Sequence, residues 1–350
     1  MQSVPTLREL AALSGVSIAT VSRALSGDPR VSPAVRERVM ALADELEYTP
    51  NAAARTLVMQ RSDLLAVVIR SGDHREFEHP FYQVVLDGIK RHATARGYDL
   101  LLLSHQGEEY GCDSGFFVAR ARRHQVSGAM VIGTTEEDVA ALARFRIPVM
   151  TVELEPPAGF EAMVGRVESD NVHGGKLALE HLHSLGRKRI ATITGMLHTA
   201  PGRRRLEGYR EASAELGLSV PDGYVQEGDF SHAAGHEGMG ALLRLAEPPD
   251  AVCAASDHSA LGAIRAVSEA GLRVPEDVAV VGFDDIAIAA LTHPALTTVR
   301  QDKEGIGEVV CKGLIDLIEG SIERPPSVTL PVELVVRESC GGTARSGLTT

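Results

Sequence analysis

Residues 6–25, which read TLRELAALSGVSIATVSRAL, carry the pattern of two short helices joined by a tight turn. Thr6 and Glu9 have the spacing of a capping box, which satisfies two backbone N–H groups at the start of a helix. Gly15 can adopt the positive φ of a tight turn, and Ser17 is a good N-cap for a second helix. The stretch therefore predicts a helix-turn-helix.

A third and longer helix is predicted after this motif. Glycine and proline at positions 27–29 break the pattern, and Ser32 followed by Pro33 places an N-cap before a proline at the first helical position. Apolar side chains then form one stripe at helical spacing, at Val35, Val39, Leu42 and Leu46. We expect residues 1–50 to form a small all-α domain, followed by a hinge at 51–61.

From Leu64 onward, short apolar runs alternate with amphipathic stretches, a pattern typical of βαβ units around parallel sheets. We expect strands at 64–69, 100–103, 129–132, 149–152, 190–194, 251–255, 278–283 and 332–336. We expect helices at 81–95, 171–184, 203–216, 258–270 and 304–318. This alternation predicts a core at 62–342 made of two doubly wound α/β lobes with parallel sheets. The expected limits are about 62–160 and 301–326 for the first lobe, 161–300 and 327–342 for the second, and 343–350 for a tail.

The charge balance differs between the first residues and the remainder. The whole chain has a net charge of −12, but residues 1–62 carry seven Arg against six Asp plus Glu, or about +1, which leaves about −13 for the rest. A large acidic core repels DNA, and a slightly basic head attracts it only weakly without regard to sequence. Any DNA binding by this chain therefore depends on specific contacts.

The cysteines and the apolar runs indicate the compartment. The cysteines, at positions 112, 253, 311 and 340, form no C-x-x-C pair, which fits a reducing compartment without structural zinc. The sequence shows no apolar export signal at its start, and no apolar run reaches the ~18 residues of a membrane span. We expect a cytoplasmic protein with no membrane partner and no cofactor.

Polar residues directly follow several of the predicted strands. Glu153, the pair Ser256-Asp257 and the pair Asp284-Asp285 each come just after an apolar run. In open parallel sheets a ligand binds beyond the carboxyl ends of the strands. Two facing lobes would bring such ends together, so the sequence predicts a polar cleft between them.

Two other patterns suggest metal binding or catalysis but lack essential parts. His232 and His236 stand four apart, as on one face of a zinc-binding helix, but the glutamate of H-E-x-x-H is missing. No Ser-His-Asp order and no phosphate-binding G-x-x-x-x-G-K-S/T loop can be assembled. We expect neither a metal site nor catalytic residues, and hence not an enzyme.

Several motifs, in the same order along the chain, resemble those of the LacI/GalR family of transcription regulators. The head supplies the stretch quoted above, then VSPAVRERV and EYTPNAAARTL. The core adds HPFYQ, SDNVHGGKLALEHL, GRKRIA, RRRLEGY, AASDHSALGAIRA, VPEDVAVVGFDD and LTTVRQD. The resemblance runs from about Thr6 to Val336. It implies a DNA-binding regulator, most often a repressor, whose periplasmic-binding-protein-like core senses a small molecule.

The resemblance implies that the second helix enters the major groove of DNA. Ile18, Ala19 and Arg23 match the positions that reach base edges. Arginine can donate two hydrogen bonds to guanine, whereas isoleucine and alanine offer only apolar contact. Side chains suited to phosphate contacts, which position without specifying, are Ser17, Thr20, Ser22, Ser32 and Asn51. The implied DNA-contacting set also includes Thr6, Tyr48 and Ala54.

The hinge is expected to fold only with help. Residues 51–58 have high helix propensity but fall short of the ~12 residues that a lone helix needs. In the family this hinge forms when two chains meet over the minor groove, which implies a homodimer on a pseudo-palindromic operator. Leu57 matches the leucine wedged into a central C-G step, where an apolar side chain unstacks the bases. From the residues alone, an exposed leucine in a flexible linker is an equal alternative.

For the core, the resemblance implies a ligand between the lobes. Aromatic faces for stacking a sugar or base are Phe81, Tyr82 and Phe230. The implied polar contacts are Glu153, Arg205, Ser256, Asp257, Asp284 and Gln301. Charged groups suit a polyhydroxyl ligand, because each hydroxyl both donates and accepts. His79, Glu153 and Ser256 depart from the residues usual in the family, so we expect a polar metabolite, a sugar or sugar derivative, without naming it.

Effector binding is expected to alter the dimer surface beside the hinge and thereby change operator affinity. The sequence leaves open whether the effector is an inducer or a corepressor. A sugar-binding protein of a transport or sensing system has the same two lobes, but the helix-turn-helix argues against that alternative. An enzyme on the same scaffold is not excluded by the fold alone.

Overall fold

The computed structural model describes residues 5–25, 28–46, 48, 62–71, 80–106 and 115–342 of the 350-residue chain. The chain divides into two compact units, Met1–Ser62 and Asp63–Thr350, which we call the head and the core and describe separately. Within the described residues, no helix has the length and apolar character needed to cross a membrane.

The described part of the head holds α1 (Leu7–Ser14), α2 (Ile18–Leu25) and α3 (Pro33–Glu45). The predicted capping box is present at Thr6 and Glu9, and Gly15 ends α1 with a φ of 68°. The Ser17 hydroxyl accepts a hydrogen bond from the Thr20 N–H at 3.1 Å and so caps α2. The predicted helix-turn-helix is confirmed. It could be predicted because its caps and its turn depend on neighbouring residues only.

The three helices of the head pack around a small apolar core. Leu10 of α1, Val21 of α2 and Val39 of α3 are fully buried where the helices meet. Ser32 takes the predicted N-cap position of α3, ahead of Pro33 at the first helical position, but its side chain makes no capping hydrogen bond. The Ser32 hydroxyl therefore does not contribute to capping α3.

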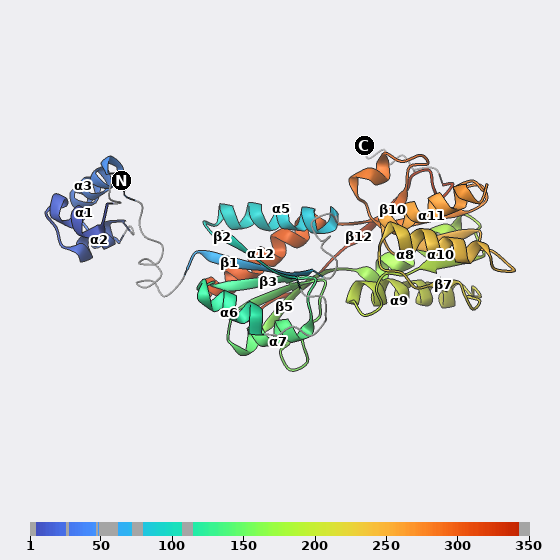
Figure 1. Cartoon of the computed structure of the whole chain (residues 1–350), viewed down its shortest axis with the longest axis horizontal. Helices are drawn as coiled ribbons and strands as arrows, with labels where there is room; N and C mark the ends of the chain where they lie inside the picture. The colour runs from blue at the N-terminus through green and yellow to red at the C-terminus, as the bar shows by residue number, and fades with distance from the viewer. Residues whose placement is uncertain are drawn as a thin grey trace. The chain divides into compact units, whose positions relative to one another are not determined.

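Lobe 1 of the core contains a six-stranded parallel sheet with the order β11-β5-β4-β3-β1-β2. Its strands are β1 (Leu64–Ser71), β2 (Asp99–Gln106), β3 (Gly128–Ile132), β4 (Val149–Val152), β5 (Val164–Ser169) and β11 (Ser327–Leu330). Helices α5 (Pro80–Ala95) and α12 (Lys303–Glu319) cover one face, and α6 (Gly115–Arg123) and α7 (Glu136–Arg144) cover the other (Figure 1). Both faces are apolar, as in other parallel sheets covered by helices.

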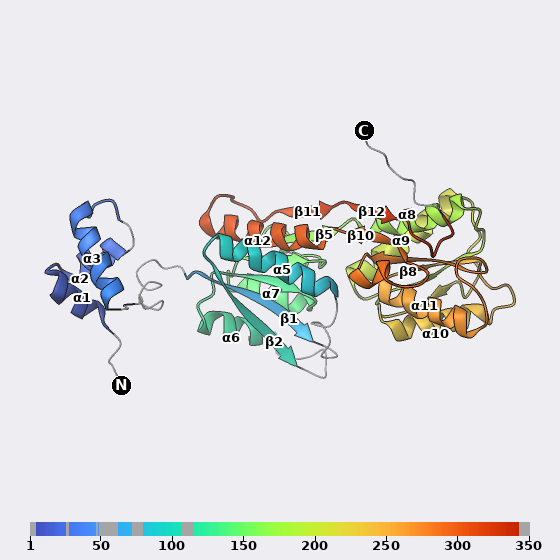
Figure 2. The same cartoon turned by 90° about the horizontal axis from the view of Figure 1, so that it is seen from above.

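Lobe 2 repeats this arrangement of helices around a sheet (Figure 2). Its strand order is β12-β10-β9-β8-β6-β7. Its strands are β6 (Ile190–Ile193), β7 (Val225–Gln226), β8 (Ala251–Ala254), β9 (Ala279–Asp284), β10 (Thr297–Gln301) and β12 (Val332–Val335). Helices α8 (Asn171–Ser184) and α9 (Ala200–Glu215) cover one face, and α10 (His232–Leu243) and α11 (Asp257–Glu269) the other. A 3₁₀ helix, η2 (Ala287–Ala290), follows β9. β12 pairs antiparallel with β10, so this sheet is not wholly parallel as expected.

The chain passes between the lobes where β5 leads to α8, where β10 leads to α12, and where β11 leads to β12. These crossings correct the lobe limits expected from the sequence. β5 belongs to the first sheet, so lobe 1 extends to Ser169 rather than to about 160, and β11 pairs in register with β5 in that sheet. The neighbour to which a strand hydrogen-bonds decides its sheet, and a strand's own residues do not encode that neighbour.

Helix pairs in both lobes approach closely through facing glycines. A Cβ at Gly88 of α5 would lie 2.6 Å from the Glu304 carbonyl oxygen of α12. A Cβ at Gly307 of α12 would overlap the Val85 carbonyl of α5. The same reciprocal contact joins α8 to α9 through Gly175 and Gly208, and α10 to α11 through Gly235 and Gly262. Each pair can pack at this separation only because neither helix carries a side chain at the contact.

Gly307→Ala should therefore destabilise the core, by about 1–3 kcal/mol, because the added methyl group forces two backbones apart. Gly240→Ala is the matched control, since this helical glycine of α10 has only the flexible Arg244 side chain nearby, at 3.5 Å. That change should leave stability unchanged or raise it by up to about 1 kcal/mol through helix propensity. The measurement is denaturant unfolding, and equal effects of the two substitutions would contradict this account.

Candidate functional site

The outer side of α2 carries the residues that the sequence assigned to base contacts. Ile18 is 44% exposed, and Ala19 and Arg23 are also exposed. On the other side of the helix, Val21 and Ala24 are buried in the head. Because α2 is anchored by one side only, its exposed side is available to a partner.

The remaining head residues assigned to DNA differ in their surroundings. The Ser17 and Thr20 hydroxyls lie 2.8 Å apart at the start of α2, and Ser22 is half-buried. Thr6 is exposed and caps α1. Tyr48 packs half-buried against the head's apolar core, and burial raises its pKa. Three assigned hinge positions lie outside the described residues, namely Asn51, Ala54 and Leu57.

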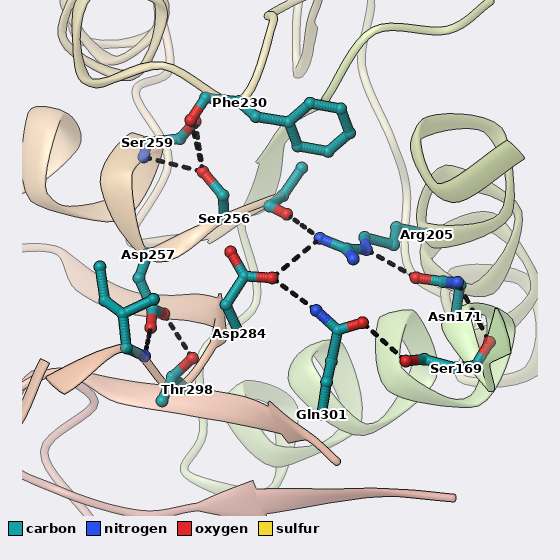
Figure 3. Close-up of polar contacts among 12 residues, drawn as sticks. Ser169, Asn171, Arg205, Phe230, Ser256, Asp257, Ser259, Asp284, Thr298 and Gln301 are labelled. Atoms are coloured by element: carbon teal, nitrogen blue, oxygen red, sulfur yellow. Dashed lines mark hydrogen bonds and ion pairs between the residues drawn. The ribbon is translucent and has the colours of Figure 1, made fainter. Parts of the chain in front are cut away.

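A polar network lies at the carboxyl ends of the core strands, with Arg205 of α9 at its centre (Figure 3). Arg205 Nε donates to Asn171 Oδ1 at 2.8 Å, and one terminal nitrogen donates to the Ala255 carbonyl at 2.5 Å. The same terminal nitrogen forms an ion pair with Asp284 Oδ1 at 3.6 Å. A guanidinium that is 9% exposed thus finds acceptors from α8, β9 and the residue after β8.

Gln301 links this network to the crossings between the lobes. Its amide nitrogen donates to Asp284 Oδ1 at 2.6 Å, and its amide oxygen accepts from the Ser169 hydroxyl at 2.7 Å. Gln301 ends β10 and Ser169 ends β5, so the bond joins two of the three crossing segments. Both residues are buried, and any movement of one lobe against the other acts on this bond.

Glu153 adds a carboxylate from lobe 1. It follows β4 with a φ of 53°, and its oxygens accept the Ser169 N–H at 2.7 Å and the Asn171 amide at 2.8 Å. Burial raises the pKa of Glu153, whereas the Ser169 hydrogen bond and the charge of Arg205 act in the opposite direction. Asn171 therefore connects a carboxylate of lobe 1 to the guanidinium of lobe 2.

Burial also lowers the pKa of Arg205, and the charges of Asp284 and Glu153 oppose that shift. The guanidinium carbon lies 3.7 Å from the ring centre of Phe283 and 5.6 Å from that of Phe230. Aromatic faces attract a desolvated cation, so these contacts add to the hydrogen bonds. The glycine contact between α8 and α9 positions this group, because a Cβ at Gly175 would overlap the Arg205 carbonyl.

Several members of this network were not predicted from the sequence. Ser169 and Asn171 flank Asp170 within the motif SDNVHGG, which was read only as a family signature. Lys303, the first residue of α12, is buried and donates to the carbonyls of Asp284 and Asp285. Burial lowers the pKa of Lys303. No signal in the sequence predicts this lysine contact, because it depends on two carbonyl groups that only the fold brings near.

Asp257, expected to contact a ligand, makes hydrogen bonds within lobe 2. It is fully buried, its Oδ1 accepts the Thr298 hydroxyl at 2.5 Å, and its Oδ2 accepts the Ile286 N–H at 2.8 Å. Its carboxylate points away from Arg205 (Figure 3). As the first residue of α11, Asp257 is held against β10 and the segment after β9, and its expected contact with a ligand stays a prediction.

The Ser256 hydroxyl likewise makes hydrogen bonds within lobe 2. It is the N-cap of α11, and its hydroxyl accepts the Ser259 N–H at 3.1 Å and donates to the Phe230 carbonyl at 2.7 Å. The residue is 1% exposed. Its position near the network agrees with the expectation from sequence, but its hydrogen bonds hold the Phe230 segment in place.

Of the neighbouring aromatics, the structure separates Phe81 from Tyr82. Phe81 is 8% exposed and packs with Val85 and Ile89 on the buried side of α5, and its expected role in stacking a ligand stays a prediction. Tyr82 is half-buried, and its hydroxyl faces Gly133, the residue after β3. Tyr82 thus lies at the carboxyl end of a strand, as Arg205 and Glu153 do.

Among the described residues, no group of three or more His, Cys, Asp or Glu side chains could hold a metal ion. His236 Nε2 lies 2.8 Å from a carboxylate oxygen of Glu269. Cys253, Cys311 and Cys340 are buried free thiols. The chemistry that the network itself offers is recognition: a cation, carboxylates, amides and aromatic faces that can hydrogen-bond and stack against a polar molecule.

Comparison with known proteins places both units of the chain. Residues 6–51 match the family described as bacterial regulatory proteins, lacI family, and residues 179–340 match the periplasmic binding protein-like domain. The HTH-type transcriptional regulator CelR of Thermobifida fusca is 38% identical over 96% of this chain and 98% of its own. The ribose operon repressor of Escherichia coli K12 is 35% identical over 89% of this chain and 93% of its own.

Solved structures agree with these matches. A complex of the transcriptional regulator CelR with cellobiose has a TM-score of 0.74 and 36% identity, covering 96% of this chain and 99% of that one. The Lac repressor dimer bound to operator and the anti-inducer ONPF has a TM-score of 0.81 and 27% identity, covering 97% and 99%. The likeness therefore includes both the head and the two-lobed core.

The buried carboxyl of Asp257 makes a testable contribution to stability. Burial, and next the charge of Asp284, raise the pKa of Asp257 above its usual 3.8. The folded state thus binds this proton more tightly than the unfolded state, and the resulting stability is lost as pH rises above about 4. Asp257→Asn carries no charge, so relative to the native chain it should gain ~1 kcal/mol or more between about pH 5 and pH 8.

Denaturant unfolding of both chains at the two pH values measures this difference. Asp222→Asn, on an exposed turn, is the control and should show no such gain. A difference between the native and Asp257→Asn chains that stays constant with pH would rule out the buried carboxyl as its source.

Proposed function

Since this chain belongs to the lacI family of bacterial regulatory proteins, we propose that two copies bind a pseudo-palindromic DNA operator under the control of a polar metabolite. The chain is a DNA-binding transcription regulator, and we place its action in the cytoplasm, as a repressor rather than an enzyme. The observation that carries the proposal is the Arg205 network, which joins both lobes through groups suited to a polar ligand.

In this proposal α2 reads the bases. Arg23 is exposed and can donate two hydrogen bonds to one guanine, while Ile18 and Ala19 offer apolar contact to a thymine methyl group. The hydroxyls at the start of α2 suit phosphate oxygens. A homodimer presents two such helices to two half-sites, which is why the operator should be pseudo-palindromic.

The ligand is proposed to be a sugar or sugar derivative bound between the lobes. Arg205 supplies donors, Asp284 and Glu153 supply acceptors, and the Gln301 amide supplies both, which matches a polyhydroxyl molecule. Tyr82 and Phe230, both half-buried, offer aromatic surface. The names of the relatives, a regulator in complex with cellobiose and a ribose operon repressor, support this class of ligand.

Coupling to DNA follows from the bonds that cross between the lobes. A ligand that takes over an oxygen of Glu153 or Asp284 changes the hydrogen bonds to Asn171 and Gln301, and so changes the relation between the lobes. The effect is a coupling free energy, typically ~1–3 kcal/mol, and it acts equally in both directions. DNA should therefore change ligand affinity by the factor by which ligand changes DNA affinity.

Selection of bound duplexes from a random DNA pool at ~0.1 M salt should recover a pseudo-palindrome with a central C-G step. Leu57→Ala should weaken binding to that duplex at least about tenfold but leave binding to unrelated duplexes nearly unchanged, because only the central step accepts the wedge. Leu13→Ala, at a leucine of α1 that is 60% exposed, is the control. Equal losses on both kinds of duplex would refute the wedge, and recovery of no motif, both without and with pooled metabolites, would refute the operator.

Cellobiose or ribose should shift the affinity for the selected duplex by about 5- to 150-fold. Arg205→Lys should reduce the affinity for that sugar at least about tenfold, because a lysine cannot bond to Asn171, Ala255 and Asp284 together. Arg210→Lys, an exposed position on the same helix, is the control. Calorimetry on folded variants measures sugar affinity; full sugar affinity in Arg205→Lys would exclude Arg205 as a contact.

A further inference from the structure

A group of exposed arginines on lobe 1 is unexplained by the functions above. We call it the lobe-1 rim; its members are Arg120, Arg122, Arg123, Arg144 and Arg146. The chain has 47 Asp plus Glu against 35 Lys plus Arg, yet within the described residues none of these arginines forms an ion pair with a carboxylate. Among the described residues of the core, no carboxylate therefore neutralises their charge.

Phenylalanine rings hold three of these side chains. The Arg122 guanidinium carbon lies 5.5 Å from the ring centre of Phe145, which connects the end of α6 to the residue after α7. Arg120 stacks similarly on Phe116, at 5.2 Å, and Arg144 on Phe160, at 5.6 Å. A ring beneath a guanidinium restricts its position without removing its charge, so the rim offers ordered cations to an anion.

Except for Arg120, whose partner Phe116 lies at the start of α6 and contacts His105 near the carboxyl end of β2, the rim lies at the amino-terminal edge of the first sheet. The Ser127 N–H, four residues beyond α6, donates to the Leu64 carbonyl at the start of β1, at 2.9 Å. The Ala129 N–H donates to the Pro148 carbonyl just before β4, at 2.9 Å, which places the end of α7 at the same edge. This is the edge at which the chain enters the core at Asp63, opposite the strand ends that carry the Arg205 network.

Connectivity keeps DNA bound by the head within reach of this edge. The path from Tyr48 to Ser62 has fourteen steps. At ~3.5 Å or less per residue it spans at most about 50 Å, the length of ~15 base pairs. The same edge also carries Asp63, Asp99, Glu161, Glu319 and Glu323, together with Arg96 and Arg324, so the rim arginines leave it with a small positive excess. An otherwise acidic core thus carries cations where the chain leads to the head.

We propose that the lobe-1 rim binds the phosphate backbone of DNA that flanks the operator, without regard to base sequence. Arginine suits this ligand because its planar fork matches two phosphate oxygens, and each neutralised phosphate releases counterions. The contact adds affinity and offsets the repulsion between the acidic core and the duplex. The inference rests on the proposed operator binding by the heads.

The test uses the full chain and compares native protein with the combined variant R122Q/R123Q/R146Q. The control, R210Q/R265Q/R273Q, removes the same charge from exposed arginines of lobe 2. Each protein is titrated with the selected operator carrying flanks of about 5 or about 30 base pairs, between about 0.05 and 0.2 M salt. The slope of log Kd against log salt counts the phosphate contacts, at ~0.9 per contact.

On the long duplex, the rim variant should lower this slope by about 2 to 3 and weaken binding at least about tenfold at the lowest salt, while the control should not. On the short duplex all three proteins should agree. Equal slopes for the rim variant and the control on the long duplex would refute the proposed contact between the rim and DNA. An acidic protein would then be the class of partner left for this surface. Native protein that binds neither duplex would instead refute the operator binding itself, and the rim with it.

Discussion

The arrangement of the core is organised around one buried charge, the guanidinium of Arg205, which needs hydrogen-bond acceptors in place of water. Withdrawing such a group from water costs several kcal/mol unless acceptors replace the lost water. Here the acceptors are Asn171, Asp284 and the Ala255 carbonyl. Asn171 is bonded in turn to Glu153 of lobe 1, and Asp284 is bonded to Gln301 and through it to Ser169. The direct acceptors of this cation belong to lobe 2, and their further hydrogen bonds extend the network to Glu153 and Ser169 at the carboxyl ends of the lobe-1 strands.

The same requirement makes the core suitable as a sensor. The helices that carry the network are packed through facing glycines, so each lobe resists internal change and differences concentrate where the lobes meet. The groups at that junction are bonded to one another, and in the proposed function a polar ligand replaces those bonds with its own. Recognition and change of shape therefore act on the same hydrogen bonds, which is the requirement for two-state control.

Parallel sheets also give lobe 1 two chemically different edges. Strand ends at one edge carry Glu153 and Ser169, which face lobe 2. The opposite edge receives the ends of α6 and α7, and with them the arginines of the lobe-1 rim. Because a helix returns antiparallel to the strands that it connects, helix ends and strand starts share an edge. The two edges thus differ in charge and chemistry, and the proposed ligand site and the proposed DNA contact lie at opposite edges.

The sequence alone determined what depends on neighbouring residues or on a family pattern. The capping box at Thr6, the turn at Gly15 and helix α8 follow from local capping and spacing, and Arg205 and Asp284 were found because their motifs match known regulators. Strands β5 and β10 were missed because arginines interrupt their apolar pattern. Only the tertiary structure assigned β11 to lobe 1. It also placed Phe81 in the apolar core and Tyr82 beside a strand end. The hydrogen bonds of Asp257 to Thr298 and Ile286 likewise depend on the fold. Periodicity within a segment specifies which side of it is apolar, but not which strand, carbonyl or cation meets that side, because distant parts of the chain supply those partners.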